Sequence, residues 1–117
     1  MTQSASKHAK RAQTIFEQAV AAHRAGRLKE ALVGYVEVVE LDPTSSQAFN
    51  NMGVALRAQG TFHAAVSSYK RAIAIKDDDA GSHSNLGNAL RALGRHSEAE
   101  ASHRQALAID PNYLEAR

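Results

Sequence analysis

The sequence contains no cysteine among its 117 residues. That absence excludes a disulfide framework, a thiolate nucleophile and any zinc or iron–sulfur site held by cysteine. Long apolar runs are also missing, since no stretch approaches the roughly 18 apolar residues that a membrane-spanning helix needs. No apolar run follows the basic residues near the N-terminus, so a secretory signal is not expected either. By elimination, the sequence predicts a cytoplasmic protein.

A large excess of charge of one sign is lacking too. Fourteen Lys and Arg against twelve Asp and Glu leave a net charge of +2, which is too small for a general nucleic-acid binder. The fractions of hydrophobic residues (44%) and charged residues (22%) are those of an ordinary globular protein. We therefore expect neither a nucleic acid nor a membrane as a partner.

Proline and glycine are scarce, and those that are present recur at one period. The two prolines, Pro43 and Pro111, both follow aspartate and lie 68 residues apart, which is twice 34. Three columns of residues repeat at a spacing of 34: Gly26, Gly60 and Gly94; Ala31, Ala65 and Ala99; and Tyr35, Tyr69 and His103. Independent columns that share a single period indicate an internal repeat.

The repeat divides the chain into segments. A basic N-terminal arm (1–11) precedes three units (12–45, 46–79 and 80–113), and residues 114–117 open a further unit that stops. The arm forms either a disordered tail or an extension of the first helix. The terminal units of a repeat array need a cap with a polar outer face, and residues 114–117 are too short to provide one. The exposed edge of the third unit could therefore pack against something else, and self-association through it is one candidate.

Each unit is predicted to fold as a helical hairpin. In the third unit, apolar residues at three- and four-residue spacing predict a helix over Ser82–Leu93. Gly94 ends this helix, because glycine takes the left-handed conformation of a helix C-cap at little cost. A second helix over about 97–109 ends before Pro111, since proline disfavours helical geometry in the preceding residue.

The columns of the repeat resemble those of the tetratricopeptide repeat family over residues 12–113. The family pattern has Leu-Gly at the seventh and eighth positions of the unit, alanine at the twentieth, an aromatic residue at the twenty-fourth and proline at the thirty-second. The third unit has Leu86-Gly87, Ala99 and Pro111 there, with His103 in place of the aromatic residue. The first two units depart further, with Gln18-Ala19 for Leu-Gly in the first and Asp77 for proline in the second.

This resemblance implies an all-α fold, a right-handed superhelix of three stacked helix-turn-helix hairpins. In the family, the first helix of each hairpin lines a concave groove. The resemblance also implies a scaffold that binds peptides or proteins and is not itself an enzyme.

The residues themselves also give no sign of catalysis. The sequence has no glycine-rich phosphate loop, no Gly-x-Ser-x-Gly elbow and no His-Glu-x-x-His motif. The run Asp77-Asp78-Asp79 lacks the alternating ligands and the final glutamate of a calcium loop, so we interpret it as a solvated turn. We expect no catalytic residue, no cofactor and no metal.

Three of the six histidines, His83, His96 and His103, lie in the third unit. They could form a metal-binding or pH-sensing cluster, because imidazole binds metals and titrates near neutral pH. We instead interpret them as replacements for bulky residues in packing columns. On that interpretation the third unit is the least stable one and loosens in acid if the rings are buried neutral.

The groove residues follow from the family template. They are Gln13, Phe16, Val20, His23 and Arg24 in the first unit, Gln47, Asn50, Asn51, Val54 and Arg57 in the second, and Ser84, Asn85, Asn88 and Arg91 in the third. This set contains three arginines and no acidic residue. Arginine binds carboxylates through two hydrogen bonds, and asparagine amides suit the backbone of an extended peptide. The predicted ligand is an extended peptide with acidic side chains or a free C-terminal carboxylate.

Two subfamily patterns can be compared with this groove. The carboxylate clamp of chaperone-docking members is matched only by Asn51, so docking to chaperone tails is not expected. The asparagine ladder of O-linked N-acetylglucosamine transferases is matched by Asn51 and Asn85 but not by Glu17. An alternative function is therefore the substrate-presenting N-terminal segment of a larger transferase, either of that type or a sulfotransferase.

Overall fold

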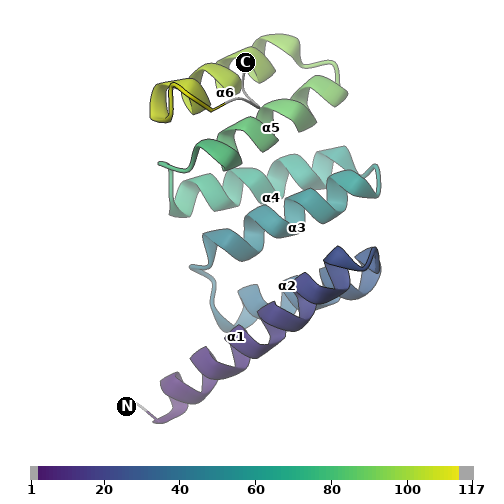
Figure 1. Cartoon of the computed structure of the whole chain (residues 1–117), viewed down its shortest axis with the longest axis vertical. Coiled ribbons are helices and arrows are strands. Elements are labelled where there is room, and N and C mark those ends of the chain that lie inside the picture. Colours follow the sequence, from purple (N-terminus) through teal and green to yellow (C-terminus); the bar gives the residue numbers. More distant parts are fainter. Residues whose placement is uncertain (1–2, 114–117) are drawn as a thin grey trace.

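A computed structural model describes residues 3–113, with side chains from residue 6 onward (Figure 1). The described part contains six α-helices: α1 (Gln3–Arg24), α2 (Leu28–Leu41), α3 (Ser46–Ala58), α4 (Phe62–Ile75), α5 (Ala80–Ala92) and α6 (His96–Ile109). Each odd-numbered helix pairs with the helix that follows it, and the hairpins stack through α2 against α3 and α4 against α5. The stack is elongated, measuring 46 × 29 × 21 Å. None of its helices is both long and apolar enough to cross a membrane.

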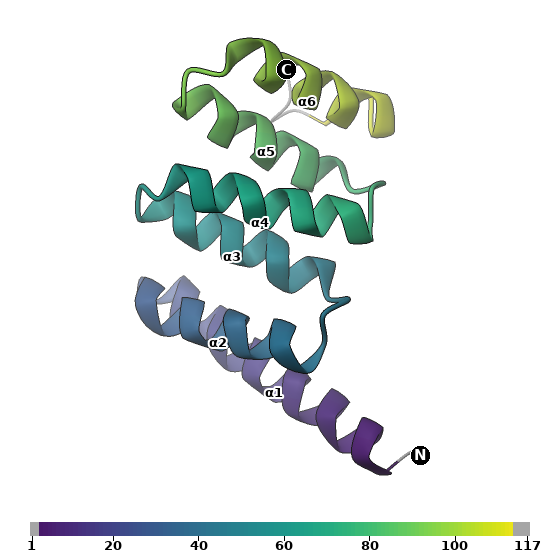
Figure 2. The ribbon, with the colours of Figure 1, turned by 180° about the vertical axis from the view of Figure 1, so that it is seen from behind.

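The first helix is longer than the predicted unit. It begins at Gln3, so residues 3–11 of the basic arm are helical and project past the end of α2 (Figures 1 and 2). Of the two alternatives for the arm, the structure has the helical extension. Lys7, Ala9 and Lys10 are strong helix formers, which favours this continuation. The predicted start of a further unit at 114–117 lies outside the described residues.

Each hairpin turns at a glycine in the left-handed conformation. Gly26, Gly60 and Gly94 have φ angles of 81°, 82° and 78°. The N–H of Gly26 donates to the carbonyl of His23 (3.0 Å), and the N–H of the next residue donates to the carbonyl of Ala22 (2.9 Å). The same pair of hydrogen bonds recurs at Gly60 and Gly94. All three turns are therefore Schellman caps, which satisfy carbonyls that the helix end leaves unpaired.

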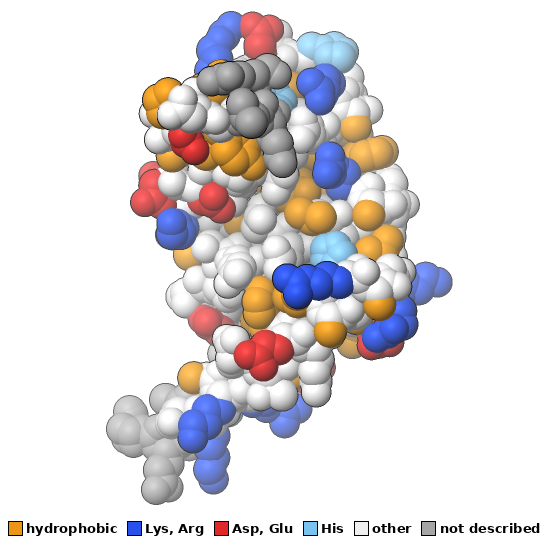
Figure 3. Space-filling view, viewed as in Figure 1, with side chains coloured by type: hydrophobic (Ala, Val, Ile, Leu, Met, Phe, Trp, Pro, Cys, Tyr) orange, Lys and Arg blue, Asp and Glu red, His pale blue; other side chains and the backbone are white. Residues whose placement is uncertain are grey.

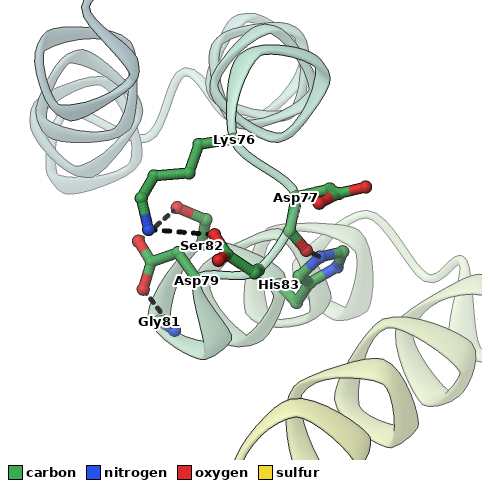
Figure 4. A network of polar contacts seen from close by, with 7 residues as sticks. Lys76, Asp77, Asp79, Gly81, Ser82 and His83 are labelled. Atoms are coloured by element: carbon green, nitrogen blue, oxygen red, sulfur yellow. Dashed lines mark hydrogen bonds and ion pairs between the residues drawn. The ribbon is translucent and has the colours of Figure 1, made fainter.

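The turn between α4 and α5 contains the three aspartates (Figure 4). Asp79 is the N-cap of α5, and its carboxylate accepts hydrogen bonds from the Gly81 N–H (3.1 Å) and the Ser82 hydroxyl (2.9 Å). Asp78 instead forms an exposed ion pair with Lys76 (2.9 Å). The three residues thus form a solvated turn, as we interpreted them, and Asp79 in addition caps α5, which was not predicted from the sequence.

In the second and third hairpins, an aromatic ring of the second helix packs directly against a glycine of the first helix. A Cβ on Gly53 of α3 would lie 2.5 Å from the ring of Tyr69, and one on Gly87 of α5 would lie 2.6 Å from the ring of His103. In the first hairpin the small residue is on the second helix, because a Cβ on Gly34 would lie 2.7 Å from the Cβ of Ala19. Ala19 stands where the other two hairpins have Gly53 and Gly87, and Gly34 on the facing helix provides the space for it.

Candidate peptide-binding groove

The helices α1, α3 and α5 lie on one side of the molecule, and α2, α4 and α6 lie on the other (Figures 1 and 2). We call the side with α1, α3 and α5 the first-helix face. Figure 3 shows this face with lysine and arginine side chains spread along its length and acidic side chains mostly at one edge, near the turns between hairpins. The face is therefore more basic than the net charge of the chain suggests.

The structure places the predicted groove residues at three levels of exposure. Gln13, Arg24, Gln47 and Arg91 are exposed, whereas Phe16, Val20, His23, Asn50, Asn51, Val54, Arg57, Asn85 and Asn88 are half-buried. Ser84 differs from the expectation, because it is fully buried (0% exposed) and follows two further buried residues, Ser82 and His83, in the sequence. A short side chain at this position of α5 does not reach the surface, so Ser84 does not contribute to an open groove.

A buried ring lies behind the twelfth residue of each unit. In the first hairpin His23 is hydrogen-bonded to the hydroxyl of Tyr35 (2.8 Å) and packs edge-on against its ring. In the second hairpin Arg57 lies near Tyr69, and in the third Arg91 is close enough to His103 for its charge to act on the imidazole. The rings come from the second helices, which the groove template does not include.

Burial governs the ionisation of these rings. It raises the pKa of Tyr69 to about 12, although the positive charge of Arg57 acts in the opposite direction. It also raises the pKa of Tyr35, against a hydrogen bond with Asn51 and the charge of Arg24. For His103, burial and then the charge of Arg91 both lower the pKa, because each disfavours the imidazolium. Burial therefore favours the neutral form of all three rings.

The asparagines link neighbouring helices. The Asn50 carbonyl oxygen accepts hydrogen bonds from the amide of Asn85 (3.2 Å) and the hydroxyl of Ser82 (3.3 Å), which ties α3 to α5. Asn88 accepts a hydrogen bond from Arg91 (3.0 Å). A side-chain amide offers two donors and an acceptor oxygen, so these contacts orient the amides and leave part of each one for a ligand.

Glu17 lies on the first-helix face and was not in the predicted set. It lines a surface hollow of about 250 Å³ on α1 together with Phe16, Val20 and Arg24. Gln13 donates a hydrogen bond to the Glu17 carboxylate (3.0 Å). The sequence does contain a signal for it, since Glu17 fills the column of Asn51 and Asn85. The α1 end of the face therefore combines apolar surface with charge of both signs, and the basic stretch lies on α3 and α5.

The three histidines of the third unit occupy separate environments. His83 donates a hydrogen bond from its Nε2 to the backbone carbonyl of Asp77 (2.9 Å; Figure 4), and His96 is exposed. Both ring nitrogens of His103 are buried, with no hydrogen-bond partner among residues 6–113. No group of three metal-ligating side chains comes together within the described part of the chain.

Comparison with known families decides the identity of the fold. The family model for the tetratricopeptide repeat matches residues 44–112, more than half of the chain. This chain belongs to the tetratricopeptide repeat (TPR) family. The predicted family and its all-α fold are thereby confirmed, and the six helices of the described part agree with three repeats. No curated protein sequence matches the chain.

Solved TPR domains superimpose closely on this one. The first TPR domain of Spaghetti (RPAP3), bound to the HSP90 peptide SRMEEVD, has a TM-score of 0.89 at 25% identity and covers 92% of this chain and 85% of its own. The first TPR domain of human RPAP3 has a TM-score of 0.86 at 26% identity, with coverages of 90% and 83%. The TPR domain of Arabidopsis OM64 has a TM-score of 0.90 at 23% identity, with coverages of 93% and 90%. The chain therefore has the fold of a protein-interaction scaffold.

Proposed function

We propose that the first-helix face of this TPR domain binds an extended peptide with acidic side chains or a free C-terminal carboxylate. The observation that carries the proposal is the placement of Arg57 and Arg91 at the same position of successive hairpins, each set against a buried neutral ring. Neither arginine has an ion pair with an acidic residue among the salt bridges of the described side chains. Their guanidinium groups therefore remain available for carboxylates of a ligand.

Each part of the face has a chemical role in this proposal. Arg57 and Arg91 bind carboxylates, because the planar guanidinium donates two parallel hydrogen bonds. The amides of Asn51, Asn85 and Asn88 bind the peptide backbone, whose N–H and C=O groups alternate as donors and acceptors. The hollow beside Phe16 and Val20 on α1 receives an apolar side chain of the same peptide.

The Spaghetti complex supports the acidic ligand. Its peptide, SRMEEVD, has three acidic residues and one basic residue. Of the carboxylate clamp of chaperone-docking members, this chain has only Asn51. We therefore expect a peptide of similar charge but different sequence preference. The transferase alternative stays a prediction.

A peptide-display selection on the whole chain tests the proposal. The wild type is compared with Arg57→Ala/Arg91→Ala and with a matched control, Arg95→Ala/Arg104→Ala, which removes the same charge from α6 and the turn before it. We expect acidic or C-terminal motifs to be enriched by the wild type and the control but not by the first variant. Equal enrichment by all three proteins, or none by the wild type, would contradict the proposal.

A further inference from the structure

The outer edge of the first hairpin has a surface hollow of about 520 Å³ between α1 and α2. Its apolar lining residues are Ile15, Ala19, Val33 and Gly34, and the rest of its lining is polar or charged: Lys10, Arg11, Thr14, Gln18, Glu30 and Glu37. In the second hairpin the residue that corresponds to Ile15 is Phe49, which is buried and has the guanidinium of Arg71 4.9 Å from its ring centre. Ile15 and Glu37 of the first hairpin thus stand where the second hairpin has a larger ring and a guanidinium packed on it.

One of the residues that line this hollow, Val33, is exposed, and a second exposed valine lies one turn further along α2. Val33 is 66% exposed and Val36 is 45% exposed, and they are two of the three large hydrophobic residues that the described surface leaves exposed. The corresponding residues of the second hairpin are Ser67 and Lys70. Val33 and Val36 are neighbours on one side of α2, because they are three residues apart. An exposed apolar patch confined to one hairpin marks a contact surface.

Charges of opposite sign lie on the two helices beside the hollow. The α1 side has Lys7, Lys10 and Arg11, and the α2 side has Glu37 and Glu40. Arg11 and Glu37 approach within 3.5 Å, and both are well exposed (65% and 43%). Exposed pairs of this kind contribute little to folding, so these groups remain available to a partner.

We propose that this edge is a self-complementary interface with a second copy of the chain. A two-fold axis parallel to α1 and α2 lays α1 of each copy over α2 of the other. The basic residues of α1 in one copy (Lys7, Lys10 and Arg11) then face Glu37 and Glu40 of the other copy. The symmetry repeats this contact on the other side of the axis, as an isologous interface requires. The same operation brings the two hollows together, with Val33 of each copy between them.

The size of the edge suits a weak contact. The 22 residues of α1 span about 33 Å and the 14 residues of α2 about 21 Å, and with a width of about 10 Å per helix they present a face of about 540 Å². Specific interfaces bury roughly 800 Å² per partner. A single acidic or basic partner would complement only one of these two sets of charges, whereas a second copy complements both.

A pair of charge-reversed variants of the whole chain tests this interface by sedimentation equilibrium. Lys10→Glu/Arg11→Glu makes α1 acidic, so that it faces the acidic α2 of the other copy. Glu37→Lys/Glu40→Lys makes α2 basic, so that it faces the basic α1 of the other copy. We expect the wild type to dimerise with a dissociation constant of about 100 μM or tighter, each variant alone to dimerise at least tenfold more weakly, and their equimolar mixture to recover the wild-type affinity. Circular dichroism confirms that each variant is folded.

The control is Arg104→Glu, which reverses a charge on α6 in the third hairpin, and we expect it to dimerise like the wild type. Three results would overturn the proposal: a wild type that stays monomeric above about 100 μM, a mixture that does not recover, or loss of dimerisation only in the α6 variant. The last result would place self-association at the third hairpin. Peptide binding by the first-helix face does not depend on any of these outcomes.

Discussion

His103 is an imidazole in a column where the first two hairpins have a buried phenol. It packs against Gly87 as Tyr69 packs against Gly53, but neither of its ring nitrogens has a hydrogen-bond partner among the described residues. The sequence identifies this column and the substitution in it. It does not reveal the charge of Arg91 beside the ring, because that proximity depends on how α5 and α6 cross.

The first prediction concerns the acid sensitivity of His103. Its pKa is lowered in the folded state by burial and then by Arg91, whereas the unfolded imidazole titrates near pH 6.5. At a pH between the folded and the unfolded pKa of His103, the unfolded chain binds more protons than the folded chain. The free energy of unfolding is therefore highest above about pH 6.5 and decreases as the pH falls below that value.

His103→Tyr removes this dependence and restores the ring of the other hairpins. We expect the urea midpoint of the wild type to fall from about pH 8 to about pH 5.5 by more than that of the variant. An equal fall in both proteins would show that His103 is not the group responsible.

The second prediction separates two reasons for glycine. Gly53→Ala places a Cβ against the Tyr69 ring, and such overpacking costs about 1–3 kcal/mol. Gly60→Ala meets no atom within 4 Å but has a φ of 82°, which costs about 1 kcal/mol. Denaturant unfolding of both variants should therefore rank Gly53→Ala as the more destabilised. The reverse order would mean that the ring can move aside.

At the scale of the element, the ends of the helices follow closely from the sequence. The predicted helices over 82–93 and 97–109 correspond to α5 (Ala80–Ala92) and α6 (His96–Ile109). Glycine and proline predict these helix ends correctly, because each one ends a helix through its own backbone geometry. The start of α1 could not be decided, because the arm has good helix formers but no marked cap. The burial of Ser84 could not be decided either, because it depends on tertiary packing.

The third prediction concerns the cap of α5. Asp79→Ala removes the acceptor for Gly81 N–H and the partner of Ser82, and the loss of an N-cap costs about 1 kcal/mol. Asp78→Ala is the matched control in the same turn, because Asp78 is 74% exposed and forms an ion pair with the exposed Lys76. We expect thermal unfolding to shift for the first variant and not for the second. A similar shift for both would contradict the capping role of Asp79.

At the scale of the whole molecule, stacking turns three similar hairpins into two different surfaces. The first-helix face places Arg57 and Arg91 in successive hairpins, so a basic stretch arises from a chain with a net charge of only +2. The repeat period predicted this arrangement, because residues at the same position of each unit lie on the same face. The exposed valines and the hollow of the first hairpin were not predicted, because Val33, Val36 and Gly34 depart from the pattern of the repeat.

The fourth prediction is a strong salt dependence of peptide binding. The Debye length falls from about 10 Å at 0.1 M salt to about 3 Å at 1 M, so exposed arginine–carboxylate attraction is largely screened over this range. Titration calorimetry with the peptide most enriched by the wild type should show weaker binding at the higher concentration. Arg57→Ala/Arg91→Ala should bind weakly at both. Wild-type binding that does not change with salt would argue for apolar recognition.

The most direct test of the account is nuclear magnetic resonance mapping of the same peptide on the wild-type chain. The chemical shifts of the Arg57 and Arg91 side chains and of the Asn51, Asn85 and Asn88 amides should change, whereas those of α2, α4 and α6 residues on the opposite side should not. Shift changes confined to the second helices or to the outer edge of the first hairpin would contradict a peptide-binding first-helix face.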